Sequence, residues 1–135
     1  MLNNKIYRNT QSYIDKVLKK YRLSSGSYPY LMNLDRNEGI SQNRISKEIG
    51  NDKAMSARTI TKLIELGFVY KKEDVNDSRA YQLYLTEEAK AIIPEIRKEL
   101  QTLVERITTD LTQEERRITM RSLAKVLMNA QRLGD

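Results

Sequence analysis

The chain has 135 residues, a length that suits one domain with a sizeable core. It carries 24 basic and 18 acidic residues, and the excess of basic residues lies within residues 1–85, so a polyanionic partner is permitted while residues 86–135 are a poor candidate for contacting phosphate. The absence of cysteine and histidine excludes disulfides, thiol chemistry and thiolate metal sites.

The first two predicted elements are helices. In residues 3–22, apolar residues recur at spacings of three, four and seven, which predicts an amphipathic helix. Residues 23–34 predict a second helix, with Ser24 or Ser27 as its N-cap. Pro29 is tolerated only in the first turn of a helix, so this helix either begins near Ser27 or bends there.

Residues 41–67 predict two short helices joined by a turn. Ser41 is the expected cap of the first helix, which ends at Gly50. Asn51 or Asp52 is the expected cap of the second, which ends at residue 67. The second helix has apolar residues on one face and basic or small residues on the other. This is the helix-turn-helix pattern, in which the second helix enters the DNA major groove.

After residue 67 the apolar period changes from helical to alternating. Residues 68–73 and 81–86 predict the two strands of a β-hairpin, and the polar residues 74–80 predict its long tip.

Two further helices are expected after the hairpin. Thr86 caps a long helix in which apolar residues from Ala89 to Ile107 form a seam at spacings of four and three, and Pro94 is expected to bend it. Thr112 and Glu115 form a capping box that starts the last helix.

Three segments of the chain carry a family resemblance: LSSGSYPYLMNL, ISQNRISKEIG and SARTITKLIELGFVYKKEDVNDSRAYQLYLTEEA. In this order they resemble the MarR family of winged helix-turn-helix transcription regulators, over residues 23–93. The most specific piece is Asp77-Ser78-Arg79 at the hairpin tip, followed by a strand that ends at Leu85-Thr86. The implied fold is mainly α with a small β-hairpin wing (α+β), a winged helix-turn-helix with N- and C-terminal dimerisation helices.

We divide the single domain into three parts. Residues 1–22 and 86–135 form a helical dimerisation region, residues 23–40 a connecting helix, and residues 41–85 the DNA-binding head. The terminal helices carry more apolar surface than the head can cover, and members of the family dimerise through these helices, so we expect a homodimer. The alternative is an intramolecular bundle. The residues expected at the dimer contact are Ile14, Ile96, Leu100, Leu103, Ile107, Leu123 and Leu127.

Arg58 is the strongest candidate for DNA contact, because a guanidinium on the outer face of the second motif helix can pair bidentately with guanine or phosphate. The resemblance implies that Arg79 reaches toward the minor groove and that Asp77 orients it. Met55 replaces a small hydroxyl residue that is common in the family, so the bases read by relatives cannot be transferred to this chain. The expected DNA-binding residues are Lys53, Met55, Ser56, Ala57, Arg58, Thr61, Lys62, Asn76, Asp77, Ser78, Arg79, Ser41, Gln42 and Arg44, with Lys71 and Lys72 as supporting candidates.

The resemblance implies a sequence-specific transcriptional regulator, which we interpret as a ligand-responsive repressor that binds a pseudo-palindromic operator as a homodimer. Many members of the family respond to small aromatic or phenolic compounds bound between the dimerisation helices and the heads. Tyr13, Tyr28, Tyr30 and Tyr84 are our candidates for lining such a site, although tyrosines at helical spacing also serve in cores. The expected partners are double-stranded DNA, a second copy of the chain and this effector, with no cofactor, metal or membrane.

Two alternative functions remain open. A non-specific DNA-architectural protein is expected to be far more basic, or to carry an apolar wedge. A winged helix that binds protein is expected to expose aromatic residues on its second motif helix. An enzyme is not expected, because no glycine-framed serine, phosphate loop or dinucleotide fingerprint is present. Without a long apolar run or a signal peptide, we expect a cytoplasmic, nucleoid-associated protein of a bacterium or archaeon.

Overall fold

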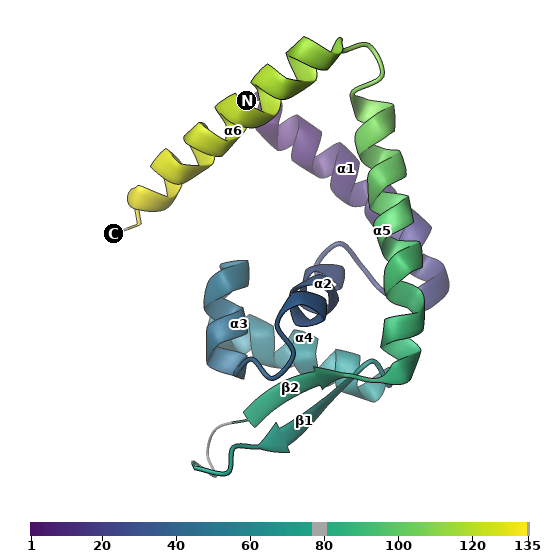
Figure 1. Ribbon diagram of the computed structural model, residues 1–135, viewed down its shortest axis with the longest axis vertical. Helices are drawn as coiled ribbons and strands as arrows, with labels where there is room; N and C mark the ends of the chain where they lie inside the picture. The colour runs from purple at the N-terminus through teal and green to yellow at the C-terminus, as the bar shows by residue number, and fades with distance from the viewer. Residues whose placement is uncertain (77–80, 135) are drawn as a thin grey trace. The chain divides into compact units, whose positions relative to one another are not determined.

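The computed structural model describes residues 1–76 and 81–134, which are mostly helical (Figure 1). Its elements are, in chain order, α1 (Leu2–Leu18), the 3₁₀ turn η1 (Lys19–Tyr21), α2 (Tyr28–Arg36), α3 (Gln42–Ile49), α4 (Lys53–Glu65), β1 (Val69–Glu73), β2 (Tyr81–Leu85), α5 (Glu87–Ile107) and α6 (Gln113–Arg132). The predicted fold class, mainly α with a small hairpin wing, is confirmed. The chain forms two compact units, residues 1–100 and 101–135, and α5 runs from the first into the second.

The helices of the helix-turn-helix begin and end at capping residues. The Ser41 hydroxyl accepts a hydrogen bond from the Arg44 amide at 3.2 Å, and Gly50 ends α3 in the left-handed region at a φ of +84°. The cap of α4 is Asp52, whose carboxylate accepts from the Met55 amide at 2.7 Å. The turn between α3 and α4 is therefore fixed at both ends by local hydrogen bonds.

Helix α2 begins later than the sequence predicts. Ser24 and Ser27 hydrogen-bond to each other in a turn, with the Ser24 amide donating to the Ser27 hydroxyl at 2.9 Å. Ser27 is the N-cap, and Pro29 lies in the first turn, where its missing amide hydrogen has no cost. The prediction of a helix from residue 23 is wrong, and the alternative of a start near Ser27 is confirmed.

The hairpin is anchored on the start of α3. Strands β1 and β2 pair antiparallel, from Val69 opposite Leu85 to Glu73 opposite Tyr81. The other edge of β2 pairs with residues 39–41: the Gly39 amide donates to the Leu83 carbonyl at 2.8 Å, and the Leu83 amide donates to the Ile40 carbonyl at 3.0 Å. The base of the wing and the N-terminus of α3 are therefore held side by side.

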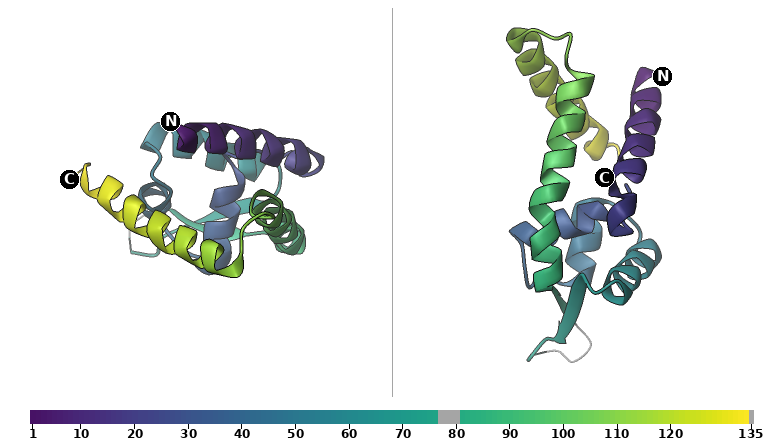
Figure 2. Two further views of the ribbon diagram at one scale, coloured as in Figure 1. Left: turned by 90° about the horizontal axis from the view of Figure 1, so that it is seen from above. Right: turned by 90° about the vertical axis from the view of Figure 1, so that its right-hand side faces the viewer.

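The first part of α5 follows β2 directly and lies beside α2 (Figure 2). Arg97 pairs with Asp35 there, and Lys90 lies 3.7 Å from the Glu38 carboxylate. The buried side chains of the first unit include Leu18, Leu31, Ile45, Leu63, Leu83 and Ile93. The helices α1 to α4, both strands and the first part of α5 contribute to this core.

Three of the predicted dimer-contact residues are buried within the protomer. Ile96 has no exposed surface in one chain, so the prediction that it contacts a second copy is wrong, whereas Ile14 and Leu103 are 7% and 8% exposed and their contact with a second copy stays a prediction. Part of the apolar seam of α5 is therefore buried by other side chains of the same chain. By contrast, Ile107, Leu123 and Leu127 are more than half exposed, and Leu100 is half-buried. Among the described residues, no helix is long and apolar enough to cross a membrane.

Candidate nucleic-acid interface

Helix α4 has one buried face and one exposed face. Ser56, Ile60 and Leu63 are buried and recur at the spacing of one side of a helix. Lys53, Arg58, Thr61 and Lys62 are exposed, Met55 is 44% exposed, and Ala57 is half-buried. The exposed face therefore presents basic, hydroxyl and small apolar side chains to solvent.

Ser56 is a correction to the predicted interface. Its side chain has no exposed surface, and its hydroxyl lies 2.9 Å from both the Tyr30 hydroxyl and the Ser46 hydroxyl. A side chain in this position cannot contact DNA. The sequence predicts DNA contact for Ser56 because a small hydroxyl is as compatible with the exposed face of the helix as with the buried one.

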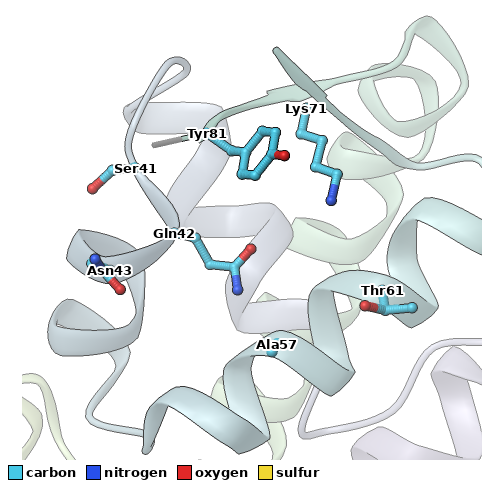
Figure 3. Close-up of a pocket in the computed structure, with 7 residues that line it drawn as sticks. All are labelled: Ser41, Gln42, Asn43, Ala57, Thr61, Lys71 and Tyr81. Atoms are coloured by element: carbon cyan, nitrogen blue, oxygen red, sulfur yellow. The ribbon is translucent and has the colours of Figure 1, made fainter. Parts of the chain in front are cut away.

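A hollow of about 350 Å³, here called the head groove, lies between α3, α4 and the base of the wing (Figure 3). Gln42, Lys71 and Tyr81 point toward it above α4, where Ala57 and Thr61 form its floor. Its lining residues are Ser41, Gln42, Asn43, Ala57, Thr61, Lys71 and Tyr81. The groove therefore joins three of the predicted DNA-contacting segments into one surface.

The strand register explains which wing residues reach the head groove. Lys71 and Tyr81 lie on the same side of the hairpin as the buried Leu83, and the Lys71 ammonium is 4.5 Å from the centre of the Tyr81 ring. Lys72 lies on the opposite side, 5.0 Å from the ring of Tyr84. The sequence prediction missed Asn43 and Tyr81; the alternation of β2 identifies Tyr81 once its register is known.

Other predicted contact residues have different surroundings. The Arg44 guanidinium is exposed and lies 3.4 Å from the Glu48 carboxylate on its own helix. Asn76 is exposed, and its backbone amide donates to the Asp74 carboxylate at 2.8 Å. Asp77, Ser78 and Arg79 lie outside the described residues.

The four tyrosines predicted to line an effector site differ in their surroundings. Tyr30 has no exposed surface and lies in the core, so the prediction that it contacts a ligand is wrong. Tyr84 stacks on Tyr70 in the wing, with ring centres 5.5 Å apart. Tyr13 and Tyr28 are half-buried. Burial, and to a lesser extent the neighbouring Tyr7, raises the pKa of Tyr28 above its ordinary value.

A larger hollow, here called the α1–α4 cleft, has a volume of about 700 Å³. It lies within the first unit, between α1, the turn that follows η1, and α4. Its lining residues include Tyr7, Gln11, Arg22, Asn51, Met55, Arg58 and Lys62. Arg58 and Lys62 thus border this cleft as well as the exposed face of α4.

Comparison with known proteins identifies the family. The MarR family model matches residues 23–81. The chain is 37% identical over 92 residues to the HTH-type transcriptional regulator BilQ of Clostridioides difficile (strain CD3), covering 68% of this chain and 62% of that protein. It is 32% identical over 114 residues to the uncharacterized HTH-type transcriptional regulator YybA of Bacillus subtilis (strain 168), covering 84% of this chain and 76% of that protein. The chain therefore spans less than two thirds of BilQ.

Solved structures show the same fold. A MarR transcriptional regulator from Methanosarcina mazei Go1 superposes with a TM-score of 0.91 at 33% identity, covering 96% of this chain and 94% of that one. A putative MarR family transcriptional regulator from Listeria monocytogenes, complexed with 26mer DNA, has a TM-score of 0.87 at 25% identity, with coverage of 96% and 87%. The chain belongs to the MarR family of winged-helix transcription regulators.

The position of Lys71 in the head groove generates a testable prediction. Lys71→Ala should weaken binding to random-sequence duplex DNA and make the slope of log K against log salt shallower by about 1, because one phosphate contact is lost. Lys72 is also a supporting candidate from the sequence, but its side chain lies on the other side of the hairpin, so Lys72→Ala is the matched control and should keep the wild-type slope. The slopes are measured by fluorescence anisotropy, and a Lys71→Ala slope equal to that of the wild type would remove Lys71 from the interface.

Proposed function

We propose that the chain is a ligand-responsive repressor that binds a pseudo-palindromic operator as a homodimer. The observation that carries the proposal is the exposed face of α4, where Arg58, Thr61 and Lys62 border the head groove or the surface beside it. A related structure was solved with DNA, which supports the same partner here. Repression follows where the operator overlaps a promoter.

In the proposed complex, α4 enters the major groove and the wing follows the adjacent backbone. Arg58 pairs with a base edge or a phosphate, and Thr61 and Ala57 offer a hydroxyl and a methyl group to neighbouring bases. Lysine and amide side chains around the head groove contact the phosphate backbone of the DNA. The proposed contact residues are Ser41, Gln42, Asn43, Arg44, Lys53, Met55, Ala57, Arg58, Thr61, Lys62, Lys71, Asn76, Asp77, Ser78, Arg79 and Tyr81.

The proposed dimer uses apolar side chains that one chain leaves exposed. On α6, Ile118, Leu123, Val126 and Leu127 are all about half exposed or more. Contiguous apolar surface of this kind usually marks an interaction site. In the proposed dimer, two copies join through this face of α6 and through Ile107. The two heads then bind half-sites about one helical turn, roughly 34–36 Å, apart.

The α1–α4 cleft is the proposed effector site. Its wall combines an aromatic ring, Tyr7, with the cationic side chains of Arg22 and Arg58. This chemistry suits a small aromatic acid, whose carboxylate pairs with a guanidinium. A ligand whose carboxylate pairs with Arg58 competes with DNA for that guanidinium, so it binds the DNA-bound protein more weakly than the free protein, which is the requirement for control by a ligand.

The operator proposal is tested by selecting bound sequences from a random DNA pool at about 0.15 M salt, a concentration at which phosphate contacts alone give weak binding. The wild-type protein should recover an inverted repeat with half-sites about one turn apart. Arg58→Ala should lose the preference at particular positions of each half-site, whereas Lys53→Ala should keep the motif and bind it more weakly. Recovery of no motif by the wild type would contradict the proposed function.

The dimer proposal is tested on α6. Leu123→Asp should dissociate the protein, because a carboxylate has to leave water when the apolar faces join. Ser122→Asp places the same charge on the neighbouring, exposed residue and should leave the dimer intact. Sedimentation equilibrium with circular dichroism distinguishes a folded monomer from an unfolded chain. A folded Leu123→Asp dimer would place the contact elsewhere.

The effector proposal is tested with 4-hydroxybenzoate as the probe. It should lower the affinity of the wild type for the selected operator, and Arg22→Asn should respond to it much more weakly. Asparagine is chosen because Arg22 has a φ of +60°, a region that asparagine tolerates. Arg8→Asn removes an exposed arginine of α1 that is absent from the cleft wall, and it should respond like the wild type. If 4-hydroxybenzoate lowered the operator affinity of both variants equally, the assignment of the effector site to the α1–α4 cleft would be contradicted.

A further inference from the structure

Helices α2, α3 and α4 belong to the same head (Figure 1), and polar groups from these helices and from the turn between α3 and α4 are hydrogen-bonded to one another. The Asn51 side-chain amide lies 2.8 Å from the Tyr30 hydroxyl, which lies 2.9 Å from the Ser56 hydroxyl. Ser56 in turn lies 2.9 Å from the Ser46 hydroxyl, and Ser46 lies 2.9 Å from the Asn51 backbone carbonyl. These hydrogen bonds start and end at one residue and form a closed ring.

The direction of every hydrogen bond in the ring follows from the single carbonyl. A carbonyl only accepts, so the one hydroxyl hydrogen of Ser46 points to Asn51. Ser46 must then accept from Ser56, and Ser56 must accept from Tyr30. Tyr30 has used its hydrogen, so the group that faces it is the amide nitrogen of Asn51 and not its oxygen. Each hydroxyl donates once and accepts once, an order in which hydrogen bonds strengthen one another.

We propose that this ring is the positioning device of α4, with Tyr30, Ser46, Ser56 and Asn51 as positioning residues that set which bases the helix meets. The inference rests on the proposed function, because it concerns sequence reading. Tyr30, Ser46 and Ser56 are 0%, 3% and 0% exposed, so water does not replace a lost partner. The ring acts on α4 at Ser56, which directly precedes the candidate contact residues Ala57 and Arg58.

Apolar packing alone does not supply this control. Ile60 and Leu63 hold the following turns of α4 by burial, which is favourable but not directional. Hydrogen bonds of fixed length and direction restrict rotation and sliding of the helix, because either motion breaks a buried contact. An alanine at position 46 would offer Ser56 no acceptor, so the ring depends on the Ser46 hydroxyl.

The test compares three variants of the full-length protein. Tyr30→Phe removes one oxygen and leaves Asn51 and Ser56 without a partner, and Ser46→Ala is a second variant that interrupts the ring elsewhere with a smaller change. Tyr28→Phe is the matched control, because it removes the same hydroxyl from a half-buried neighbour on α2 that is not in the ring. Affinities for the selected operator and for random duplex are measured where circular dichroism shows each variant folded.

Tyr30→Phe and Ser46→Ala should each lower the ratio of operator affinity to random-duplex affinity about tenfold and leave the random-duplex affinity unchanged. A loss of about tenfold is comparable to the effect of one mismatched base pair. Tyr28→Phe should keep the wild-type ratio. An unchanged ratio in both ring variants, or a parallel loss of both affinities, would overturn the inference.

Failure of the proposed function is recognised separately. A wild-type ratio near one would show that the protein does not prefer an operator, before any variant is considered. Amide hydrogen exchange of the DNA-free protein then tests whether the ring positions α4. Faster exchange in the first turns of α4 and in residues 50–52, in the ring variants alone, supports positioning by the ring; exchange equal to that of Tyr28→Phe overturns it.

Discussion

Helix α4 has to leave its outer face open to DNA, so its inner face alone must hold it in place. That face consists of Ile60 and Leu63, which are buried among apolar side chains, and Ser56, whose hydroxyl is hydrogen-bonded to α2 and α3. The caps at Ser41 and Asp52 fix the turn that leads into it. The arrangement of the exposed Arg58, Thr61 and Lys62 depends on these few internal contacts.

The pairing of residues 39–41 with β2 links α3 to the wing. Because β2 is bonded on both edges, Lys71 and Tyr81 are held opposite the first turn of α3 and above α4. The head groove is therefore a consequence of sheet pairing rather than of loop conformation. On the other side of α4, Asn51 belongs to the ring and also to the wall of the α1–α4 cleft. In our proposal, an effector in that cleft lies against a member of the ring that positions α4.

Periodicity and caps predicted the helices and the hairpin because these signals are local: Ser41, Asp52, Thr112 and the change of period after residue 67 act within a few residues. The errors concern contacts between distant residues. Ser56 was assigned to DNA, and Tyr30 to a ligand, because a hydroxyl is equally compatible with a surface and with a buried hydrogen bond across 26 positions. Ile96 belongs to the apolar seam of α5, but spacing does not say which chain covers a seam.

The most direct test of the account is to titrate the isotope-labelled protein with duplex DNA and follow its backbone amide resonances. The account places DNA on α4 and the head groove. It predicts the largest shifts at residues 41–44, 53–62 and 71, with smaller changes on the opposite side of the hairpin. Shifts concentrated on α5 or α6, with residues 53–62 unaffected, would contradict it.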